Sequence, residues 1–557
     1  MKKWRFSFVF FLFLFFSLII TIRLYSLQIK KGDYYQAIAI GQQVFLKEIL
    51  GERGEIFFND GVKILAQNIK KNIVYISPEK LEDKEKTAEI LEKVLNLSKK
   101  EILSEFEKNK ILKKEIENNR VEELKKQNLK GVYLDEVERR FYPFNSLAAP
   151  VIGFVNEDGI GQYGVEGYFD NLLKGEKGFL NEKKSPFGYL ASLTSGEDFS
   201  QPLPGSQVIL TLDYNVQFFA EKILKEAKEK WDIDSGEIIV IEPSTGKIIA
   251  LANFPSFDPN QYGKEKDLTV FLNGATQKLF EPGSVFKPIT MAIGLEEGLI
   301  TPETTYNDFG FVKIGNYTIY NYGRKKWGKA TMTEVLEKSI NTGAVFVKEQ
   351  INNNVYLQYI DKFGFTEPTG IELKEEISSQ KNLKEGYEIN FANSSFGQGI
   401  AITPLQLVKA FCAIANGGKL VKPYLIKTII KENGEKIETQ PKVLREILSS
   451  KTTSQLTNML IKVVENAFAK RAKIPGYYIA GKTGTAQISK EGEKGYYEDK
   501  TIQSFIGFFP AFNPKVLILI KLNNPKGVGT AEYSAVPLFR ELAKEIISLW
   551  QIPPGYQ

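Results

Sequence analysis

Four serines in the chain are followed three residues later by a lysine, a spacing that can supply a serine nucleophile with a base. Three of the pairs stand in turn-like surroundings, and they are Ser77–Lys80, Ser244–Lys247 and Ser378–Lys381. Only Ser284–Lys287, in "EPGSVFKPIT", begins a segment with apolar residues at helical spacing. Because positions i and i+3 share one helix face, the two side chains can meet. This context singles out Ser284.

The pair alone leaves two interpretations open. A serine at the first turn of a helix is most often a cap for the backbone. An exposed lysine has a pKa of about 10.4 and is a poor base. Burial near another cation would lower the pKa of Lys287 by several units and make it competent. Other residues must decide between the cap and the nucleophile.

The chain contains no histidine. This excludes the Ser-His-Asp triad, the Cys-His pair and every zinc site that uses histidine. A serine nucleophile here therefore needs a lysine or a carboxylate as its base. The single cysteine, Cys412, lies in an apolar run, so we expect it to be buried and inert.

Two further motifs follow in the chain. "EKSINTGA" carries Ser339 and Asn341 two residues apart, where a turn would point a hydroxyl and an amide into one cleft. "IAGKTGTAQ" follows an apolar strand pattern, and its polar positions offer a cation and hydroxyls to a carboxylate: Lys482, Thr483 and Thr485. Gly484 between them allows another backbone to approach the strand. Taken alone, the first motif is more often an ordinary loop or cap, and the second is commonly just a strand end at the surface.

The elements that must position these motifs follow from periodicity. The segment from 208 to 231 predicts a strand and an amphipathic helix, and 235–254 predicts a hairpin around "EPSTGK". Residues 270–420 read as mainly helical, and the end of the chain returns to strands before a last amphipathic helix. Strands at both ends with helices between predict an α/β (α+β) domain, residues 203–557, with a central antiparallel sheet flanked by helices.

The region before it, residues 29–202, reads as a mixed α/β pedestal, and the linker-like patch Thr194–Gln207 marks the boundary. Its charged stretch from Pro78 to Lys130 predicts a set of exposed helices. Residues 1–28 predict a cytoplasmic tip and a transmembrane helix, because Phe6–Ile22 carries no charge and basic residues precede it. The basic leader places the N-terminus in the cytoplasm and the body outside. A cleaved signal peptide is the alternative, but no small-x-small site follows the apolar run.

The net charge of +6 is small for 557 residues, and no basic stripe alternates with aromatic residues. We therefore expect no nucleic-acid partner.

Taken together, serine-x-x-lysine, Ser-x-Asn and Lys-Thr-Gly in this order resemble the penicillin-binding protein and serine β-lactamase superfamily. Over nearly the whole chain the sequence resembles a class B penicillin-binding protein. "RGEIFFNDG" at Arg53 is similar to the N-terminal signature of that class, with its Asp-Arg part altered, and "RFYPFNSLAAPVIGFVNEDGIGQYGVEGYFDNLLKGEKG" resembles its dimerisation segment. No segment resembling a glycosyltransferase precedes the pedestal, so we expect the monofunctional kind.

The resemblance implies a role for each motif residue. Ser284 would be the acylated nucleophile and Lys287 its general base. Ser339 would relay a proton to the leaving group, and Asn341 would donate to the substrate amide. Lys482 would tune the field of the site.

It also implies a substrate grip. Thr483, Gly484 and Thr485 would bind the substrate, the two threonines joining Lys482 at its terminal carboxylate. The backbone N–H groups of Ser284 and Thr485 would form the oxyanion hole.

The implied activity is a serine-type D,D-transpeptidase that cross-links peptidoglycan stem peptides ending in D-Ala-D-Ala and is acylated by β-lactams. No metal or organic cofactor is implied. The segments "GFVNEDGIGQYGVEG" and "KTGTAQISKEGEKGYYEDKTIQSFIGFFPA" resemble the division (septal) kind more than the elongation kind. Expected partners are the membrane, other division proteins and a polytopic glycosyltransferase of the shape, elongation, division and sporulation family. The enzyme would be a single-pass protein of the cytoplasmic membrane, with its catalytic domain outside the cytoplasm.

Alternatives share the same motifs. An elongation-type transpeptidase, a membrane-anchored β-lactamase or β-lactam sensor and a D,D-carboxypeptidase would use the same residues. No glutamate stands out as the base that deacylation by water needs. A catalytically idle division scaffold would need neither Lys287 nor Lys482.

Overall fold

The structure is a computed structural model that describes residues 3–31, 44–49, 51–95, 97–107, 112–116, 118–127, 129–184, 190–191, 199–490 and 495–555. The chain divides into two compact units. The first comprises Met1–Arg53 with Lys174–Gly205, and the second comprises Gly54–Leu173 with Ser206–Gln557. The domain boundaries expected from the sequence, at 28/29 and 202/203, separate the anchor, the pedestal and the transpeptidase region. They do not coincide with the limits of these two units, and they stay predictions.

The first unit contains one long helix and a small sheet. Helix α1 (Lys3–Tyr25) continues into a π-helical turn, η1 (Ser26–Lys30). Residues Ser7–Lys30 are long and apolar enough to cross a membrane, by length and composition. Strand β8 (Gly178–Lys184) pairs antiparallel with β1 (Val44–Ile49), β9 (Leu190–Ala191) and β10 (Phe199–Ser200). Residues 194–198 of the expected linker patch lie outside the described residues.

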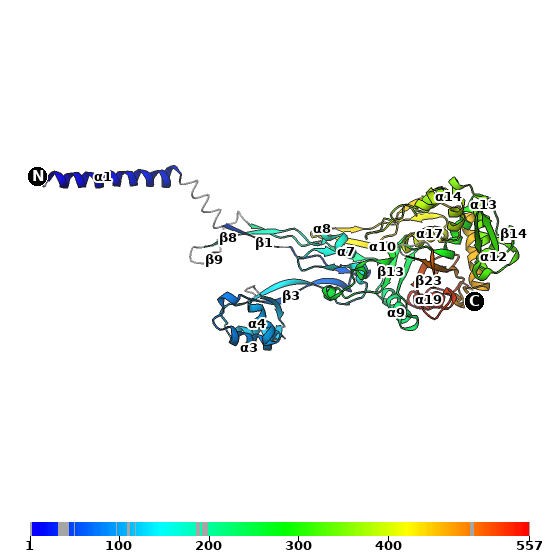
Figure 1. The fold of residues 1–557 in the computed structure, drawn as a ribbon, viewed down its shortest axis with the longest axis horizontal. Helices are drawn as coiled ribbons and strands as arrows, with labels where there is room; N and C mark the ends of the chain where they lie inside the picture. The colour runs from blue at the N-terminus through cyan, green and yellow to red at the C-terminus, as the bar shows by residue number, and fades with distance from the viewer. Residues whose placement is uncertain are drawn as a thin grey trace. The chain divides into compact units, whose positions relative to one another are not determined.

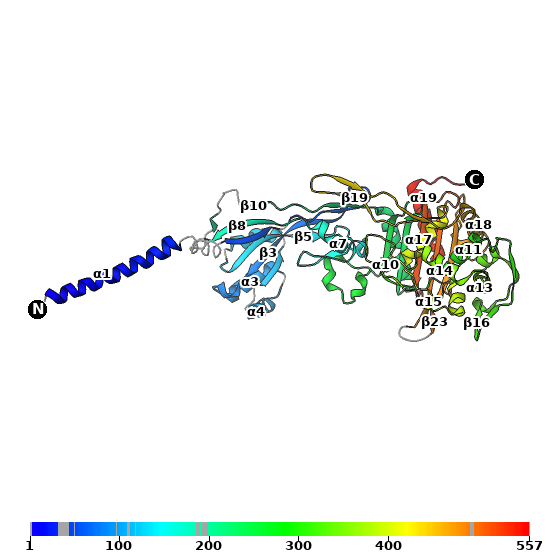
Figure 2. The ribbon, with the colours of Figure 1, turned by 90° about the horizontal axis from the view of Figure 1, so that it is seen from above.

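The second unit begins with a helical lobe on a long hairpin. Strand β3 (Ile64–Ile76) pairs antiparallel with both β4 (Leu112–Ile116) and β5 (Val132–Phe141). Three helices lie between these strands in the chain: α3 (Lys84–Leu95), α4 (Lys99–Glu107) and α5 (Asn118–Lys126). Figure 2 shows α3 and α4 beside β3, where their apolar faces form a separate small core with the strands. The prediction of helices alone over 78–130 was therefore wrong at β4, because the charged "LKKEI" pairs at a sheet edge that its own periodicity does not reveal.

One sheet joins this region to the rest of the unit. Strand β11 (Gln207–Leu210) pairs in parallel with β2 (Ile56–Phe57) and antiparallel with β19 (Ile426–Ile430). Strand β2 in turn pairs with β3, and β20 (Lys436–Glu438) closes the other edge. The main hydrophobic core contains residues from both segments, from Ile56 in the pedestal segment to Ile552 near the end of the chain. The pedestal segment of the second unit and the C-terminal segment thus share both a sheet and a core.

The three sequence motifs lie on or beside a five-stranded antiparallel sheet. Its order is β13-β12-β24-β23-β22, with bounds β12 (Ser235–Glu242), β13 (Lys247–Phe254), β22 (Ala480–Ser489), β23 (Tyr496–Phe509) and β24 (Val516–Asn523). The predicted hairpin of 235–254 and the predicted C-terminal strands are confirmed. The first and last strands of the region from 235 to 523 meet because β12 pairs with β24.

Helices flank this sheet. The amphipathic α9 (Tyr214–Trp231) and α19 (Ala535–Trp550) pack on each other and on the sheet, and Figure 1 shows them together. Another group also packs there, with α11 (Lys287–Glu296) beside α18 (Ser450–Asn466), as Figure 2 shows, and α17 (Pro404–Ala415) against α18. Residues Lys287–Leu295 of α11 are buried on every side, as expected of a helix in the centre of a domain.

Residues 270–420 are less helical than the sequence predicts. Two short hairpins occupy 305–331, formed by β14 (Thr305–Asp308), β15 (Phe311–Ile314), β16 (Tyr317–Tyr320) and β17 (Gly328–Thr331). The remaining elements of the unit are mostly short and are α6 (Ala149–Ile152), β6 (Phe154–Val155), β7 (Gly161–Gln162), α7 (Gly164–Tyr168), α8 (Asp170–Leu173), α10 (Gly274–Gln277), α12 (Met332–Glu337), α13 (Asn341–Gln350), α14 (Asn353–Lys362), α15 (Lys381–Lys384), α16 (Glu388–Ser394), β18 (Lys419–Val421) and β21 (Val443–Glu446).

Candidate active site

Ser284 lies in a tight 3₁₀ turn, η5 (Gly283–Phe286), that runs directly into α11. Pro288 falls in the first turn of α11, where its missing N–H costs no helical hydrogen bond. No side-chain cap is formed at the start of either element. The structure therefore does not use Ser284 as a cap, and its hydroxyl is available for another role.

Lys287 is the centre of a hydrogen-bond cluster. Its Nζ lies 3.0 Å from Ser284 Oγ, 2.6 Å from the carbonyl oxygen of Ser339, 3.2 Å from Ser339 Oγ and 2.8 Å from Asn341 Oδ1. The contacts with Ser339 and Asn341 join Lys287 to residues more than fifty positions away in the chain. The first two motifs therefore meet on a single amine.

Burial sets the charge of this amine. Lys287 is only 1% exposed, and its pKa lies well below the usual 10.5 because burial disfavours the ammonium and the nearby charge of Lys482 adds repulsion. Among the groups that contribute to this shift, none is a carboxylate. A lysine in this setting loses its proton well below pH 10.5, so its neutral amine can act as a base.

Ser339 owes its position to an unusual backbone. Helix α12 ends at Glu337, and Ser339 takes the left-handed conformation, with φ of 54°, before α13 begins at Asn341. A non-glycine residue seldom adopts this conformation, and such strain concentrates at functional sites. Asn341 is held from the other side, because its Nδ2 donates to the carbonyl oxygen of Tyr320 at 3.0 Å.

The third motif lies on β22, the edge strand of the five-stranded sheet. Lys482 is fully buried, and burial lowers its pKa to about 7. Its Nζ donates to Ser339 Oγ and to the carbonyl oxygen of Thr483, each at 3.0 Å. Ser339 Oγ thus lies between two buried amines, 3.2 Å from Lys287 and 3.0 Å from Lys482.

Glycine lets β22 approach the catalytic turn. A Cβ on Gly484 would lie 2.6 Å from Ser504 Oγ and 3.0 Å from Val285 Cγ1. A Cβ on Gly283, where φ is 60°, would meet Ala486 at 2.8 Å. The strand and the turn are therefore in direct contact only because both positions lack a side chain.

A cleft of about 1190 Å³ lies over this arrangement. Ser284, Ser339, Asn341, Thr483 and Thr485 all line it. Lys287 and Lys482 do not line the cleft and lie buried beneath it. The hydroxyls and the amide thus face the cleft, while the two amines lie buried beneath them.

Several residues that sequence reasoning did not single out hold this geometry. The Glu281 carboxylate accepts from the N–H of Gly399 at 3.1 Å and from the Tyr496 hydroxyl at 3.0 Å. The N–H of Gly283 donates to the carbonyl oxygen of Gly397 at 2.9 Å. Glu281 stands three residues before Ser284, but nothing in its local pattern announces partners more than a hundred residues away.

The remaining sequence candidates lie elsewhere. Among the other serine-x-x-lysine pairs, Ser244 lies in the turn between β12 and β13, while Ser77 and Ser378 lie in loops. None of the three lines the cleft. Cys412 is buried in α17, which confirms the prediction of burial, and burial raises the pKa of its thiol.

Comparison with known proteins agrees with the fold. Residues 236–546 match the penicillin binding protein transpeptidase domain, and residues 48–210 match the penicillin-binding protein dimerisation domain. Stage V sporulation protein D of Bacillus subtilis is 33% identical over 526 residues, which cover 92% of this chain and 80% of that protein. Peptidoglycan D,D-transpeptidase FtsI of Buchnera aphidicola subsp. Schizaphis graminum is 30% identical over 574 residues, which cover 99% of this chain and 96% of that protein.

A solved structure extends the likeness to three dimensions. The crystal structure of penicillin binding protein 3 from Mycobacterium tuberculosis in complex with aztreonam superposes with a TM-score of 0.71 at 27% identity, covering 91% of this chain and 98% of that one. The family match alone spans more than half of the 557 residues. The chain therefore belongs to the penicillin-binding protein transpeptidase family, in the class B arrangement of a dimerisation domain followed by a transpeptidase domain.

Proposed function

We propose that the protein is a peptidoglycan D,D-transpeptidase that works through an acyl-enzyme on Ser284. The observation that carries this proposal is the contact of Ser284 Oγ with a buried Lys287 amine whose pKa is lowered. It rests also on the relatives, because FtsI of Buchnera aphidicola bears the name peptidoglycan D,D-transpeptidase.

Acylation begins with proton transfer from Ser284 to Lys287. A neutral amine has two N–H groups and one lone pair. When its two shortest contacts, to Ser339 O and Asn341 Oδ1, take the N–H groups, the lone pair is left for the Ser284 hydroxyl. Ser284 Oγ then attacks the carbonyl carbon of the penultimate D-alanine. The backbone N–H groups of Ser284 and Thr485 bind the oxyanion that develops.

The leaving group requires a proton. Ser339 Oγ lies between Lys287 and Lys482, so it can pass a proton from the lysine pair to the departing nitrogen. The C–N bond breaks, free D-alanine leaves, and the acyl group remains on Ser284. An amine from a neighbouring stem peptide then attacks the ester, Lys287 accepts its proton, and the cross-link forms as Ser284 Oγ is released.

The edge of the sheet supplies the substrate grip. An extended stem peptide can pair with β22 as an added strand, with Asn341 donating to its amide. Lys482 in its charged form, with Thr483 and Thr485, attracts the terminal carboxylate. A β-lactam presents a similar carboxylate and a strained amide to Ser284. After the amide bond breaks, the opened ring stays attached to the acyl group, so no separate leaving group departs from the cleft.

The cellular role we propose is cross-linking at the division septum. The segments at 153–167 and 482–511 carry the sequence features of the septal kind. Helix α1 anchors the protein in the cytoplasmic membrane with its N-terminus in the cytoplasm, because the basic residues Lys2, Lys3 and Arg5 precede the apolar span. A polytopic glycosyltransferase of the shape, elongation, division and sporulation family would supply the glycan strands. Depletion that blocks septation supports this role, whereas a defect confined to elongation or to sporulation contradicts it.

The decisive test of the chemistry is intact mass. The purified protein is incubated with benzylpenicillin and followed over hours, with Ser284→Ala as the matched control. We expect one stable adduct of the drug on the parent and none on the variant. An adduct that vanishes within seconds while drug is consumed would identify a β-lactamase. A folded parent without any adduct would refute the assignment of Ser284.

A further inference from the structure

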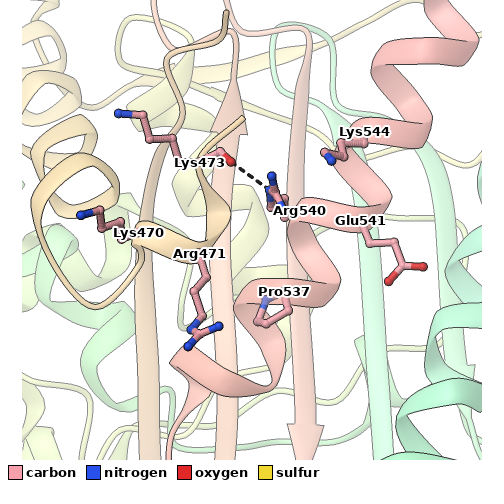
Figure 3. Close-up of a pocket in the computed structure, with 7 residues that line it drawn as sticks. All are labelled: Lys470, Arg471, Lys473, Pro537, Arg540, Glu541 and Lys544. Atoms are coloured by element: carbon pink, nitrogen blue, oxygen red, sulfur yellow. Dashed lines mark hydrogen bonds between the residues drawn. The ribbon is translucent and has the colours of Figure 1, made fainter. Parts of the chain in front are cut away.

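A second hollow of about 530 Å³ lies on the transpeptidase region, away from the catalytic residues. It is formed by η7 (Lys470–Ala472) and the first half of α19, and its charged lining is Lys470, Arg471, Lys473, Arg540, Glu541 and Lys544. We call this hollow the basic groove. Five cations face one carboxylate, and in Figure 3 the Glu541 carboxylate points away from the Arg540 guanidinium.

The groove is charged because four of its five cations form no ion pair among the described residues. Within the part of the chain that the structure describes, Lys473 pairs with Glu465, but no ion pair involves Lys470, Arg471, Arg540 or Lys544. Such a concentration of like charge is unfavourable unless an anion offsets it.

The guanidinium of Arg540 is also prearranged. Its Nε donates to the carbonyl oxygen of Lys473 at 2.9 Å, which orients the group and leaves its other N–H donors for a ligand (Figure 3). A fixed guanidinium binds planar oxyanions through two parallel hydrogen bonds. A carboxylate is such an oxyanion.

The groove adjoins the catalytic cleft. The Arg471 guanidinium lies 4.6 Å above the ring of Tyr533, and Tyr533 itself lines the cleft, as does Phe468 two residues before η7. Tyr533 ends the short turn η8 (Ala531–Tyr533), whose first N–H donates to Thr485 Oγ1 at 3.2 Å. A polymer that enters the cleft at Thr485 can thus continue past Tyr533 to Arg471.

We propose that the basic groove binds the carboxylates of stem peptides that neighbour the reacting one on the same peptidoglycan strand. This inference rests on the proposed function. Every stem that is not yet cross-linked ends in a carboxylate, so the strand is a regular polyanion. The cleft holds one stem end, and the adjoining stems meet the unpaired cations. Such remote contacts hold the strand while the reaction proceeds at Ser284.

The test uses the full chain in detergent with Ser284→Ala to prevent acylation. The probe is a fluorescent glycan strand with stem peptides ending in D-Ala-D-Ala, and its Kd is measured by anisotropy. The groove variant carries Lys470→Gln, Arg471→Gln and Lys544→Gln. The matched control removes the same charge from exposed lysines outside the groove and the cleft, with Lys381→Gln, Lys384→Gln and Lys436→Gln.

We expect the groove variant to bind the strand about tenfold more weakly than the control variant, the order that three exposed charge contacts supply. Converting the stem carboxylates to methylamides should weaken binding to the control variant more than binding to the groove variant. Equal affinity of the two variants for the strand would overturn the inference. Tighter, groove-dependent binding of a glycerol phosphate polymer would also overturn it, by assigning the groove to phosphodiesters.

Benzylpenicillin separates the two proposals, because the drug reports on Ser284 and carries no stem peptides. The rate of acylation is measured on the same groove variant with Ser284 restored. The groove substitutions should reduce this rate by a factor at least severalfold smaller than the factor by which they reduce affinity for the strand. If the parent forms no adduct, the proposed function fails. If the parent forms the adduct but the groove substitutions leave the affinity for the strand unchanged, only the present inference fails.

Discussion

At the scale of single residues, the site depends on two amines placed where water cannot stabilise their charge. Lys287 and Lys482 both contact Ser339 Oγ, and both have lowered pKa values because they are buried. No carboxylate among the described residues pairs with either amine to restore the ammonium. This arrangement keeps an unprotonated amine available as a base at a lower pH than a free lysine allows, without any histidine.

The charge of Lys482 contributes to the lowered pKa of Lys287. We therefore predict that Lys482→Met raises the pKa of Lys287, so that a smaller fraction of the protein carries the neutral base at low pH. The acid limb of the pH profile for benzylpenicillin acylation should move to higher pH. Lys482→Arg keeps the charge and serves as the control. An acid limb that stays in place in Lys482→Met would contradict the electrostatic coupling.

The same burial predicts how stability depends on pH. The pKa of Lys482 is about 7 in the folded protein and 10.5 in the unfolded chain. Between these values the unfolded state binds the extra proton, so the free energy of unfolding rises with pH. The slope from one such group is at most about 1.4 kcal/mol per pH unit. Lys482→Met should therefore show a smaller rise between pH 7.5 and 9 than the parent in urea titrations, and an unchanged slope would refute it.

At the scale of elements, the catalytic turn is held by a loop more than a hundred residues away. Gly397 has φ of 83°, and a Cβ there would lie 2.2 Å from the carbonyl oxygen of Gly283. The position of a Cβ is fixed by its own backbone, and the oxygen belongs to the backbone of Gly283, so neither atom can rotate away. Glu281 ties the same two segments through the N–H of Gly399.

Gly397→Ala should accordingly displace the Ser284 turn. We expect a loss of stability beyond the cost of left-handed backbone, which is about 1 kcal/mol, and at least a tenfold slower acylation. Gly417→Ala is the matched control, because Gly417 has the same φ of 83° with no atom within 4 Å of the added Cβ. Thermal unfolding and acylation rates of the two variants separate the cost of the left-handed backbone, which both share, from the clash with Gly283, which only Gly397→Ala has. Identical behaviour would show that the collision is relieved elsewhere.

At the scale of the second unit, the pedestal segment and the transpeptidase segment are one folding core. Phe58 from the first is fully buried and packs edge-to-face on Tyr214 of α9, with ring centroids 5.3 Å apart. The helical lobe differs, because Leu91 belongs to a separate core with its own strands. A common core should unfold cooperatively, whereas the lobe can open by itself.

This difference predicts the effects of two core truncations. Phe58→Ala should cost about 3–5 kcal/mol and lower the temperature at which acylation is lost. Leu91→Ala should cost about 2–5 kcal/mol within the lobe and leave that temperature unchanged. Acylation after stepwise heating, with hydrogen exchange of the lobe, measures both effects. If Leu91→Ala lowers the acylation midpoint as much as Phe58→Ala does, the two cores are coupled.

The sequence by itself determined the strands at both ends of the transpeptidase region, its terminal helix and the apolar span of α1. These features follow from periodicity, which is a local property. It also excluded histidine chemistry and selected Ser284 among four serines, since only that one begins an apolar helix. The roles of the motif residues stay predictions, although the structure brings the motifs together.

Tertiary structure decided the rest. The strand β4 and the hairpins of 305–331 depend on partners that local pattern does not encode. The lowered pKa of Lys287 depends on burial under the cleft and on Lys482, almost two hundred residues along the chain. The contacts of Glu281 and the convergence of η7 with α19 in the basic groove are likewise long-range. Residue types state what chemistry is available, but distance, burial and field exist only once the chain has folded.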